Sequence, residues 1–137
     1  MSTAQNKASV RRLNAAMNKG DFSILPELFA PNYVFHTTPE VKGPEALKQS
    51  FTALRNAFPD YKEKIEHMVA EGEMVAVFYT LQGTFKGKYG DMAPTGKKMT
   101  ITNAVLARFK GDKQVEAWQY IDSLEWYRQL GMPIPPA

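Results

Sequence analysis

The chain has 137 residues, with 17 lysines and arginines, 14 acidic residues and no cysteine. This length predicts a single domain, residues 1–137, around one core. The lack of cysteine excludes disulfides, thiolate nucleophiles and cysteine-based metal sites. Basic and acidic residues are interleaved, so we expect no nucleic-acid partner, and no apolar run approaches the roughly 20 residues of a membrane span. Residues 1–7 contain no apolar signal region, so we expect a cytoplasmic protein.

Three helices are predicted in the first half of the chain. The first spans residues 4–19 and ends at Gly20, because its apolar positions recur at helical spacing. Asp21 is a candidate N-cap for a short second helix. The third helix spans residues 44–58 and is stopped by Pro59. Each apolar stripe has to be covered by another layer of structure.

The remaining segments are typical of strands, and they occupy residues 33–36, 61–69, 74–81, 100–109 and 115–121. Residues 74–81 are apolar on both faces, which predicts a central strand covered on each side. Lys110-Gly111-Asp112-Lys113 is a hairpin turn between the last two strands. Helices followed by strands predict an α+β fold, in which a curved antiparallel sheet wraps around the N-terminal helices. A sheet curled in this way leaves a conical pocket.

The last strand and the helix after it contain the most distinctive candidate site. At a period of two residues, Trp118, Tyr120 and Asp122 share one face, which we assign to the pocket. Apolar surroundings raise the pKa of a carboxyl group, so that it can exchange protons near neutral pH. Asp122 with Glu125 also matches a capping box, so a purely structural role for Asp122 is the alternative.

The register of the last hairpin decides which residues accompany this carboxyl group. If Gly111 and Asp112 are the two loop residues, Asn103 lies opposite Tyr120 and enters the pocket. A loop one residue longer would instead bring in Thr102, Ala104 and Leu106.

Other side chains are weaker candidates. His36 ends its strand, where it could orient a substrate carbonyl, pair with Asp122 or serve only the structure. Met17 and Phe51 belong to the predicted core, part of which lines the cavity. The two histidines, His36 and His67, lack a metal-binding spacing, so no metal is expected.

Short motifs in a fixed order extend over nearly the whole chain. They include Tyr33-Val34-Phe35-His36, Gly43-Pro44-Glu45, Gly83-Thr84-Phe85-Lys86-Gly87, Pro94-Thr95-Gly96, Glu116-Ala117-Trp118 and Gln129-Leu130-Gly131. With these motifs the chain resembles the SnoaL-like polyketide and ester cyclases of the nuclear-transport-factor-two-like superfamily. The resemblance implies a curved sheet wrapped by helices, no cofactor, and Asp122 as the general acid/base of an intramolecular aldol closure.

Two functions are therefore open. In the first, a cofactor-independent cyclase or isomerase acts on a small hydrophobic carbonyl compound. Its catalytic residues would be Asp122 and His36, and the residues around the substrate would be Trp118, Tyr120, Asn103, Met17 and Phe51. In the second, a non-catalytic domain binds a small molecule or dimerises, and Asp122 only caps its helix. In both, a two-fold dimer through the outer side of the sheet is expected.

Overall fold

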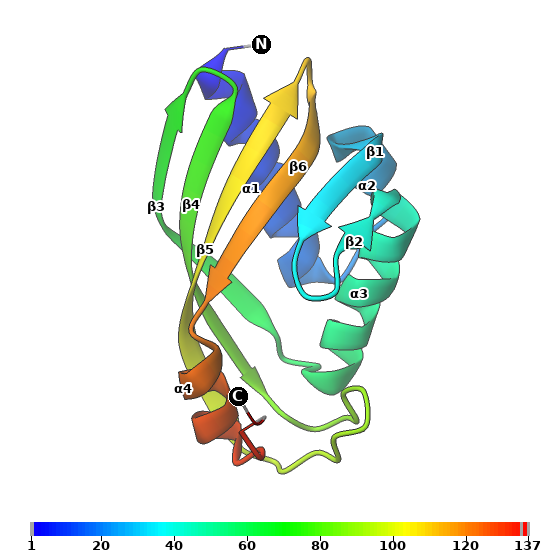
Figure 1. The fold of residues 1–137 in the computed structure, drawn as a ribbon, viewed down its shortest axis with the longest axis vertical. Helices are drawn as coiled ribbons and strands as arrows, with labels where there is room; N and C mark the ends of the chain where they lie inside the picture. Colours follow the sequence, from blue (N-terminus) through cyan, green and yellow to red (C-terminus); the bar gives the residue numbers. More distant parts are fainter. Residues whose placement is uncertain (1, 135, 137) are drawn as a thin grey trace.

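A computed structural model of the chain describes residues 2–134 and 136. This part of the chain contains four helices, namely α1 (Thr3–Lys19), α2 (Leu25–Leu28), α3 (Gly43–Ala57) and α4 (Ser123–Leu130). It contains six strands, namely β1 (Phe29–His36), β2 (Val41–Lys42), β3 (Lys62–Glu71), β4 (Met74–Thr84), β5 (Lys98–Lys110) and β6 (Lys113–Ile121). The predicted α+β class is confirmed (Figure 1).

The strands form one sheet in the order β2-β1-β6-β5-β4-β3 (Figure 1). Antiparallel pairing joins β3 through β6, as predicted. The sheet is mixed rather than wholly antiparallel, because β1 runs parallel to β6, with Phe35 opposite Ala117. Most of the chain separates these two strands, so no hairpin turn imposes an antiparallel direction on them.

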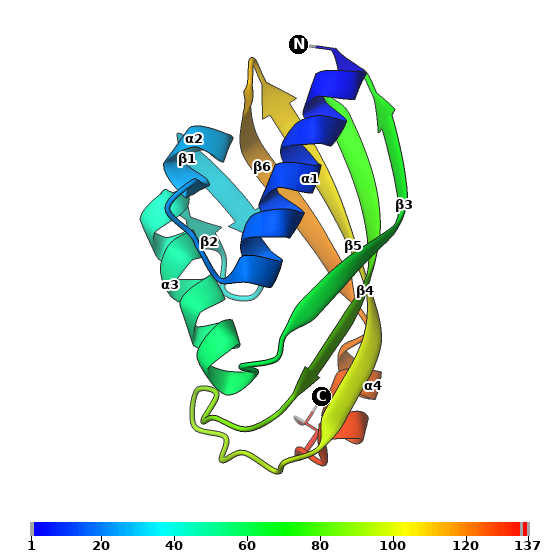
Figure 2. The ribbon, with the colours of Figure 1, turned by 180° about the vertical axis from the view of Figure 1, so that it is seen from behind.

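Helix α1 lies along one face of the sheet, against β3 and β4, and α3 lies beside it (Figure 2). We call the face turned toward these helices the inner face, and the opposite one the outer face. The first helix begins with a capping box between Ser2 and Gln5 and ends at Gly20, which has a φ of 74°. Its predicted span is confirmed, because glycine is the residue that adopts this left-handed conformation without strain.

Strand β4 is paired on both sides, with β3 and β5, and is next to the edge of the sheet rather than at its centre. Val75, Val77, Tyr79 and Leu81 are buried on its inner face. The outer face is not covered in the same way, since Phe78 is 41% exposed. The prediction that both faces of this strand are covered is therefore wrong, and the outer face presents apolar surface.

The segment between β4 and β5 is tied to the end of α3. The amide groups of Lys86 and Gly87 donate hydrogen bonds to the Ala57 carbonyl, at 2.9 and 3.0 Å. A Cβ atom on Gly87 would lie 2.2 Å from the Asn56 carbonyl oxygen, so this approach requires glycine. These contacts join the helical layer to the far end of the sheet.

Candidate functional site

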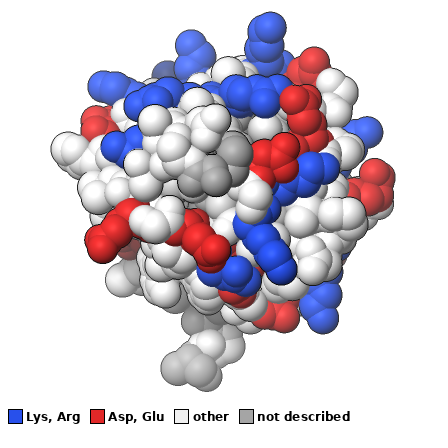
Figure 3. Space-filling view, turned by 90° about the horizontal axis from the view of Figure 1, so that it is seen from above, with Lys and Arg blue, Asp and Glu red and all other residues white. Residues whose placement is uncertain are grey.

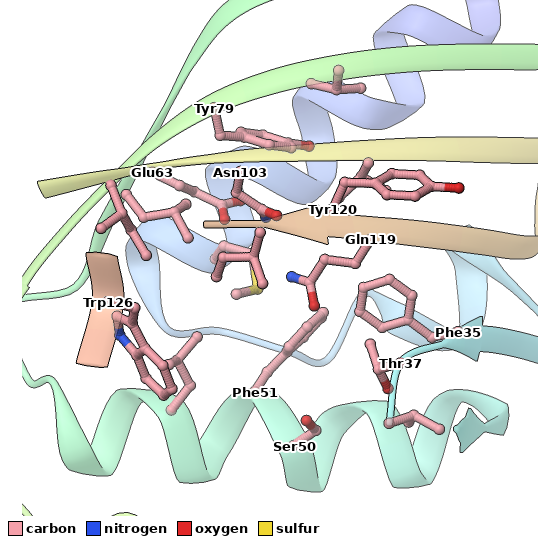
Figure 4. Close-up of a pocket in the computed structure, with 18 of the residues that line it drawn as sticks. Phe35, Thr37, Ser50, Phe51, Glu63, Tyr79, Asn103, Gln119, Tyr120 and Trp126 are labelled. Carbon is pink, nitrogen blue, oxygen red and sulfur yellow. The ribbon is translucent and has the colours of Figure 1, made fainter. Parts of the chain in front are cut away.

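A cavity of about 1040 Å³ lies between the inner face of the sheet and helices α1 and α3. Its volume is at the upper end of the range of small-molecule sites. Most of its wall is apolar and includes Met17, Phe35, Phe51, Leu54, Val77 and Trp126 (Figure 4). Met17 and Phe51 thus lie where the sequence predicted, and their contact with a substrate stays a prediction.

A β-bulge in β6 determines which side chains of that strand enter the cavity. The hairpin turn is the predicted one, because Lys110 pairs with Lys113. Phe109 then pairs with Gln114 and Arg108 with Glu116, so Val115 is an extra residue. One inserted residue moves every later side chain to the opposite face of a strand.

The bulge reverses the predicted orientation of Trp118 and Tyr120. Trp118 lies opposite Leu106 and Tyr120 opposite Ala104. Figure 4 shows Gln119 pointing into the cavity and Tyr120 pointing away from it. Tyr120 is 66% exposed and lies at the rim. The prediction that Trp118 and Tyr120 form the pocket floor is therefore wrong, and Gln119 occupies that position.

Asp122 is the N-cap of α4, which is the structural role predicted for it as an alternative to catalysis. Its Oδ1 accepts a hydrogen bond of 3.3 Å from the backbone N–H of Glu125. The Glu125 carboxylate does not complete a capping box and instead pairs with Arg128. Asp122 is exposed and borders the cavity. A catalytic role for this carboxyl group stays a prediction.

His36 belongs to an ionic cluster at the rim. Its Nδ1 lies 2.6 Å from Glu40 Oε2, and its Nε2 lies 2.9 Å from Glu116 Oε2. The hydrogen bond to Glu116 has the larger effect and the one to Glu40 the smaller, and both raise the pKa of His36. The His36 ring stacks on Trp118, with ring centroids 5.1 Å apart. Both ring nitrogens are occupied, so the predicted alternative of a His36–Asp122 pair is not formed.

Glu63 is a buried acid that the sequence analysis missed. Its side chain points from β3 into the cavity (Figure 4), and the residue is 9% exposed. Its Oε2 accepts a hydrogen bond of 2.9 Å from the Tyr61 hydroxyl. Burial raises the pKa of Glu63 to about 7, although bonds from Tyr61 and Asn14 lower it. The available signal was the alternation Tyr61, Glu63, Ile65, which places this acid on an apolar face.

Two asparagines of α1 hold the backbone of β3 at Glu63, and we call Asn14 and Asn18 the asparagine clamp. Asn18 Oδ1 accepts a hydrogen bond of 2.8 Å from the Glu63 N–H. The side-chain amides of Asn14 and Asn18 both donate to the Glu63 carbonyl oxygen at 2.9 Å. Because β3 is an edge strand, these bonds replace those of a neighbouring strand and fix the position of Glu63.

Asn103 also faces the cavity, although not beside the residues predicted to accompany it. It lies opposite Tyr79 on β4 and Ile121 on β6. The residue is 5% exposed, and its Oδ1 has no hydrogen-bond partner within the described part of the chain. Figure 4 shows the polar ends of Glu63 and Asn103 directed into the same part of the cavity. The cavity therefore combines apolar walls with a carboxyl group able to exchange protons near neutral pH.

The surface carries mixed charge. Figure 3 shows basic and acidic side chains interspersed over the face that it presents. Among the described residues, no helix has both the length and the apolar character required to cross a bilayer. Within the same residues, no group of three or more His, Asp or Glu side chains is arranged to hold a metal ion.

Comparison with known proteins gives consistent matches. A family model described as SnoaL-like polyketide cyclase matches residues 7–130. The chain is 31% identical over 132 residues to aklanonic acid methyl ester cyclase DnrD of Streptomyces peucetius, covering 92% of this chain and 90% of the relative. It is 33% identical to aklanonic acid methyl ester cyclase DauD of Streptomyces sp. (strain C5), covering 92% and 81%.

A solved structure shares the architecture. TsrD from Streptomyces laurentii superimposes with a TM-score of 0.89, covering 97% of this chain and 99% of TsrD. The two sequences are 20% identical, so this likeness concerns the fold alone.

Proposed function

Because the chain belongs to the SnoaL-like polyketide cyclase family, we propose that it closes a ring in a small hydrophobic carbonyl compound by cofactor-independent acid/base catalysis. The observation that most supports this proposal is the cavity of about 1040 Å³, with its apolar walls and few polar groups. Such a site binds an apolar ring system and strengthens electrostatic interactions with the reacting atoms.

The proposed reaction is an intramolecular aldol closure with Asp122 as the acid/base. The Asp122 carboxylate accepts a proton from a carbon flanked by two carbonyl groups, which leaves an enolate. The enolate carbon forms a bond to a ketone carbon of the same molecule, and the ketone oxygen becomes an alkoxide. Asp122 returns the proton to that oxygen, so substrate and product have the same composition. Asp122 borders the cavity, where a bound substrate could reach it.

The names of the relatives suggest the first substrate to test. DnrD and DauD are named for aklanonic acid methyl ester, a polyketide ester. We propose a substrate of this class for the present chain.

The test separates the chemistry of Asp122 from its cap. In Asp122→Asn the side chain still caps α4, because asparagine is as good an N-cap as aspartate, but it cannot exchange a proton. We expect kcat/KM on aklanonic acid methyl ester to fall by about 10²- to 10⁴-fold, with the melting temperature nearly unchanged. Asp122→Ala is the control, since it loses the helix cap and the carboxyl group together and should also have a lower melting temperature. Unchanged turnover in Asp122→Asn would remove Asp122 from the mechanism.

The exposure of Asp122 and its hydrogen bond to Glu125 favour a second candidate function. In this alternative the domain binds a small hydrophobic molecule without converting it, and Asp122 is only a cap. Saturable binding of the ester by the wild-type protein, with no turnover of it or of simpler β-keto esters, would favour this alternative.

We also propose a homodimer formed through the outer face. Two adjacent rows of outward side chains cross the sheet there, the first being Val69, Ala76, Leu106 and Trp118, and the second Phe78, Ala104 and Tyr120. Val69 is 63% exposed and Tyr120 is 66% exposed. A contiguous apolar strip of this kind is typical of an interface, and a two-fold axis is the commonest way for one surface to cover itself.

A further inference from the structure

Two polar residues of the cavity have no role in the reaction proposed above. Glu63 and Asn103 lie on β3 and β5, on either side of β4. Tyr79 of β4 is directly opposite Asn103, and it is opposite Ile65, the next inward residue after Glu63. Strands β3, β4 and β5 are neighbours, and the side chains of Glu63 and Asn103 therefore emerge on the same face of the sheet, one on each side of β4. Both are almost fully buried, where an unsatisfied polar group is costly.

We propose that Glu63 and Asn103 form a second binding site in the cavity, specific for a ligand that carries a carbonyl oxygen and a hydroxyl group on one ring system. The neutral carboxyl group of Glu63 donates a hydrogen bond to the carbonyl oxygen, and Asn103 Oδ1 accepts one from the hydroxyl. An enolised diketone or a hydroxylated aromatic ketone has both groups. This inference rests on the proposed function in one respect, namely that the ligand binds in the same cavity.

The hydrogen bonds around Glu63 leave its proton available to a ligand. The Tyr61 hydroxyl donates to Oε2 at 2.9 Å, and the Asn14 amide donates to Oε1 at 3.4 Å. The Asn14 amide nitrogen is a donor only, and the Tyr61 hydroxyl donates to Glu63 in this geometry, so neither neighbour takes the proton that neutral Glu63 carries. A carbonyl oxygen placed in the cavity supplies the missing acceptor.

The bonding of Asn103 indicates the complementary group. Its buried Oδ1 has no donor within the described residues, although buried amide oxygens nearly always have one. The neighbours facing it across the sheet are the Tyr79 ring and the Ile121 side chain. A ligand hydroxyl therefore gives this oxygen the donor that the described residues do not.

The charged and titratable groups near Glu63 lie on the residue just before β3, on β4 and on α3. Tyr61 precedes β3 and donates to Glu63, Tyr79 lies on β4, and burial raises the pKa of both phenols. Arg55 of α3 is held by the carbonyl oxygens of Tyr61 and Met17, at 3.0 and 3.2 Å. Helix α1 contributes only the neutral amide of Asn14 to the surroundings of Glu63. Among these groups, Glu63 is the one that titrates near neutral pH, because burial raises its pKa to about 7.

The carbonyl half of the site is tested by titrating 2-acetonaphthone into the protein at pH 5.5 and pH 8.5. We expect the wild type to bind about fivefold more tightly at pH 5.5, the value of one hydrogen bond of about 1 kcal/mol. Glu63→Gln keeps a donor at both values of pH, so its affinity should not change with pH. His67→Gln is the matched control, because it replaces a side chain on the outer face, opposite Phe78, and it should keep the fivefold effect. Wild-type affinity independent of pH, or a pH effect that persists in Glu63→Gln, would overturn the proposal.

The hydroxyl half is tested with 2-naphthol and 2-methoxynaphthalene at pH 6.5. Asn103→Leu should weaken 2-naphthol binding about fivefold and leave 2-methoxynaphthalene unaffected, since the methyl ether has no proton to donate. Equal weakening of both ligands would show a general loss of shape and would contradict the role of Asn103. All variants are first compared by far-ultraviolet circular dichroism.

These binding measurements require no turnover, so the two proposals can fail separately. A missing pH effect together with intact cyclase activity would refute the Glu63–Asn103 site alone. A pH effect in a protein that converts no β-keto ester would refute the cyclase and leave the site in place. Failure of the wild type to bind either naphthalene would refute the site.

Discussion

Glu63 shows how burial changes the behaviour of a single carboxyl group. It lies among apolar side chains of the cavity, and burial favours its neutral form over its charged form. Hydrogen bonds from Tyr61 and Asn14 oppose this effect without cancelling it. The same residue can therefore act as a donor below neutral pH and as an acceptor above it.

We predict that this carboxyl group makes folding stability depend on pH. Its pKa is about 7 in the folded chain against an ordinary value of 4.5, so the folded state binds the proton more tightly. The contribution is present below pH 4.5 and is lost as the pH rises to about 7. Between pH 5 and 8, the free energy of unfolding should fall by about 2 kcal/mol more in the wild type than in Glu63→Gln. Urea unfolding of both proteins measures this difference. If the two proteins lose stability with pH in parallel, folding does not raise the pKa of Glu63.

At the level of elements, the position of Glu63 depends on the contact between α1 and β3. The asparagine clamp supplies hydrogen bonds at a sheet edge, where a strand would otherwise face solvent. On the other side of the sheet, the bulge at Val115 has a comparable effect on β6. It directs Gln119 inward and Trp118 outward, so one inserted residue separates the cavity wall from the outer face.

We predict that the clamp contributes to stability through Asn18. Asn18→Ala removes two hydrogen bonds to the backbone of Glu63, at 2.8 and 2.9 Å, and should lower the free energy of unfolding by about 2 kcal/mol. The control is Asn56→Ala, because Asn56 also lies on a helix but is exposed, and alanine there is neutral or slightly stabilising. Thermal unfolding monitored by circular dichroism compares the two. An equal melting temperature for both variants would show that the clamp contributes nothing.

For the whole molecule, the sheet separates two surfaces with different roles. The inner face and the helices enclose the cavity, while the outer face carries Val69, Phe78 and Tyr120 as exposed apolar side chains. A dimer through the outer face would leave each cavity complete within its own subunit. It would also cover the apolar strip that a single chain exposes.

We predict that Tyr120→Glu dissociates this dimer. The substitution places a charge in the apolar strip, and an unpaired charge buried in an interface costs several kcal/mol. Light scattering after size-exclusion chromatography should give the mass of one chain for Tyr120→Glu and of two for the wild type. Leu124→Glu, which changes an equally exposed side chain on α4, should remain a dimer. A monomeric wild type would contradict the proposed interface.

Local features determined a large part of this structure from the sequence alone. Gly20 ended the first helix, Gly111 and Asp112 formed the two-residue turn, and Asp122 capped the last helix. Each of these depends on backbone conformation and hydrogen bonds within a few residues, which amino-acid type largely controls. The family motifs extended this local information to the curved sheet and its cavity.

The tertiary structure alone decided which residues occupy the cavity. The bulge at Val115, the parallel pairing of β1 with β6 and the burial of Glu63 all depend on packing between distant segments. A strand's alternation defines two faces but does not say which is inward, and one extra residue exchanges them. For this reason Trp118 and Tyr120 were assigned to the wrong face, and Glu63 was not among the predicted site residues. Only the contacts of β3 with α1, and of β6 with both of its neighbouring strands, distinguish the two faces.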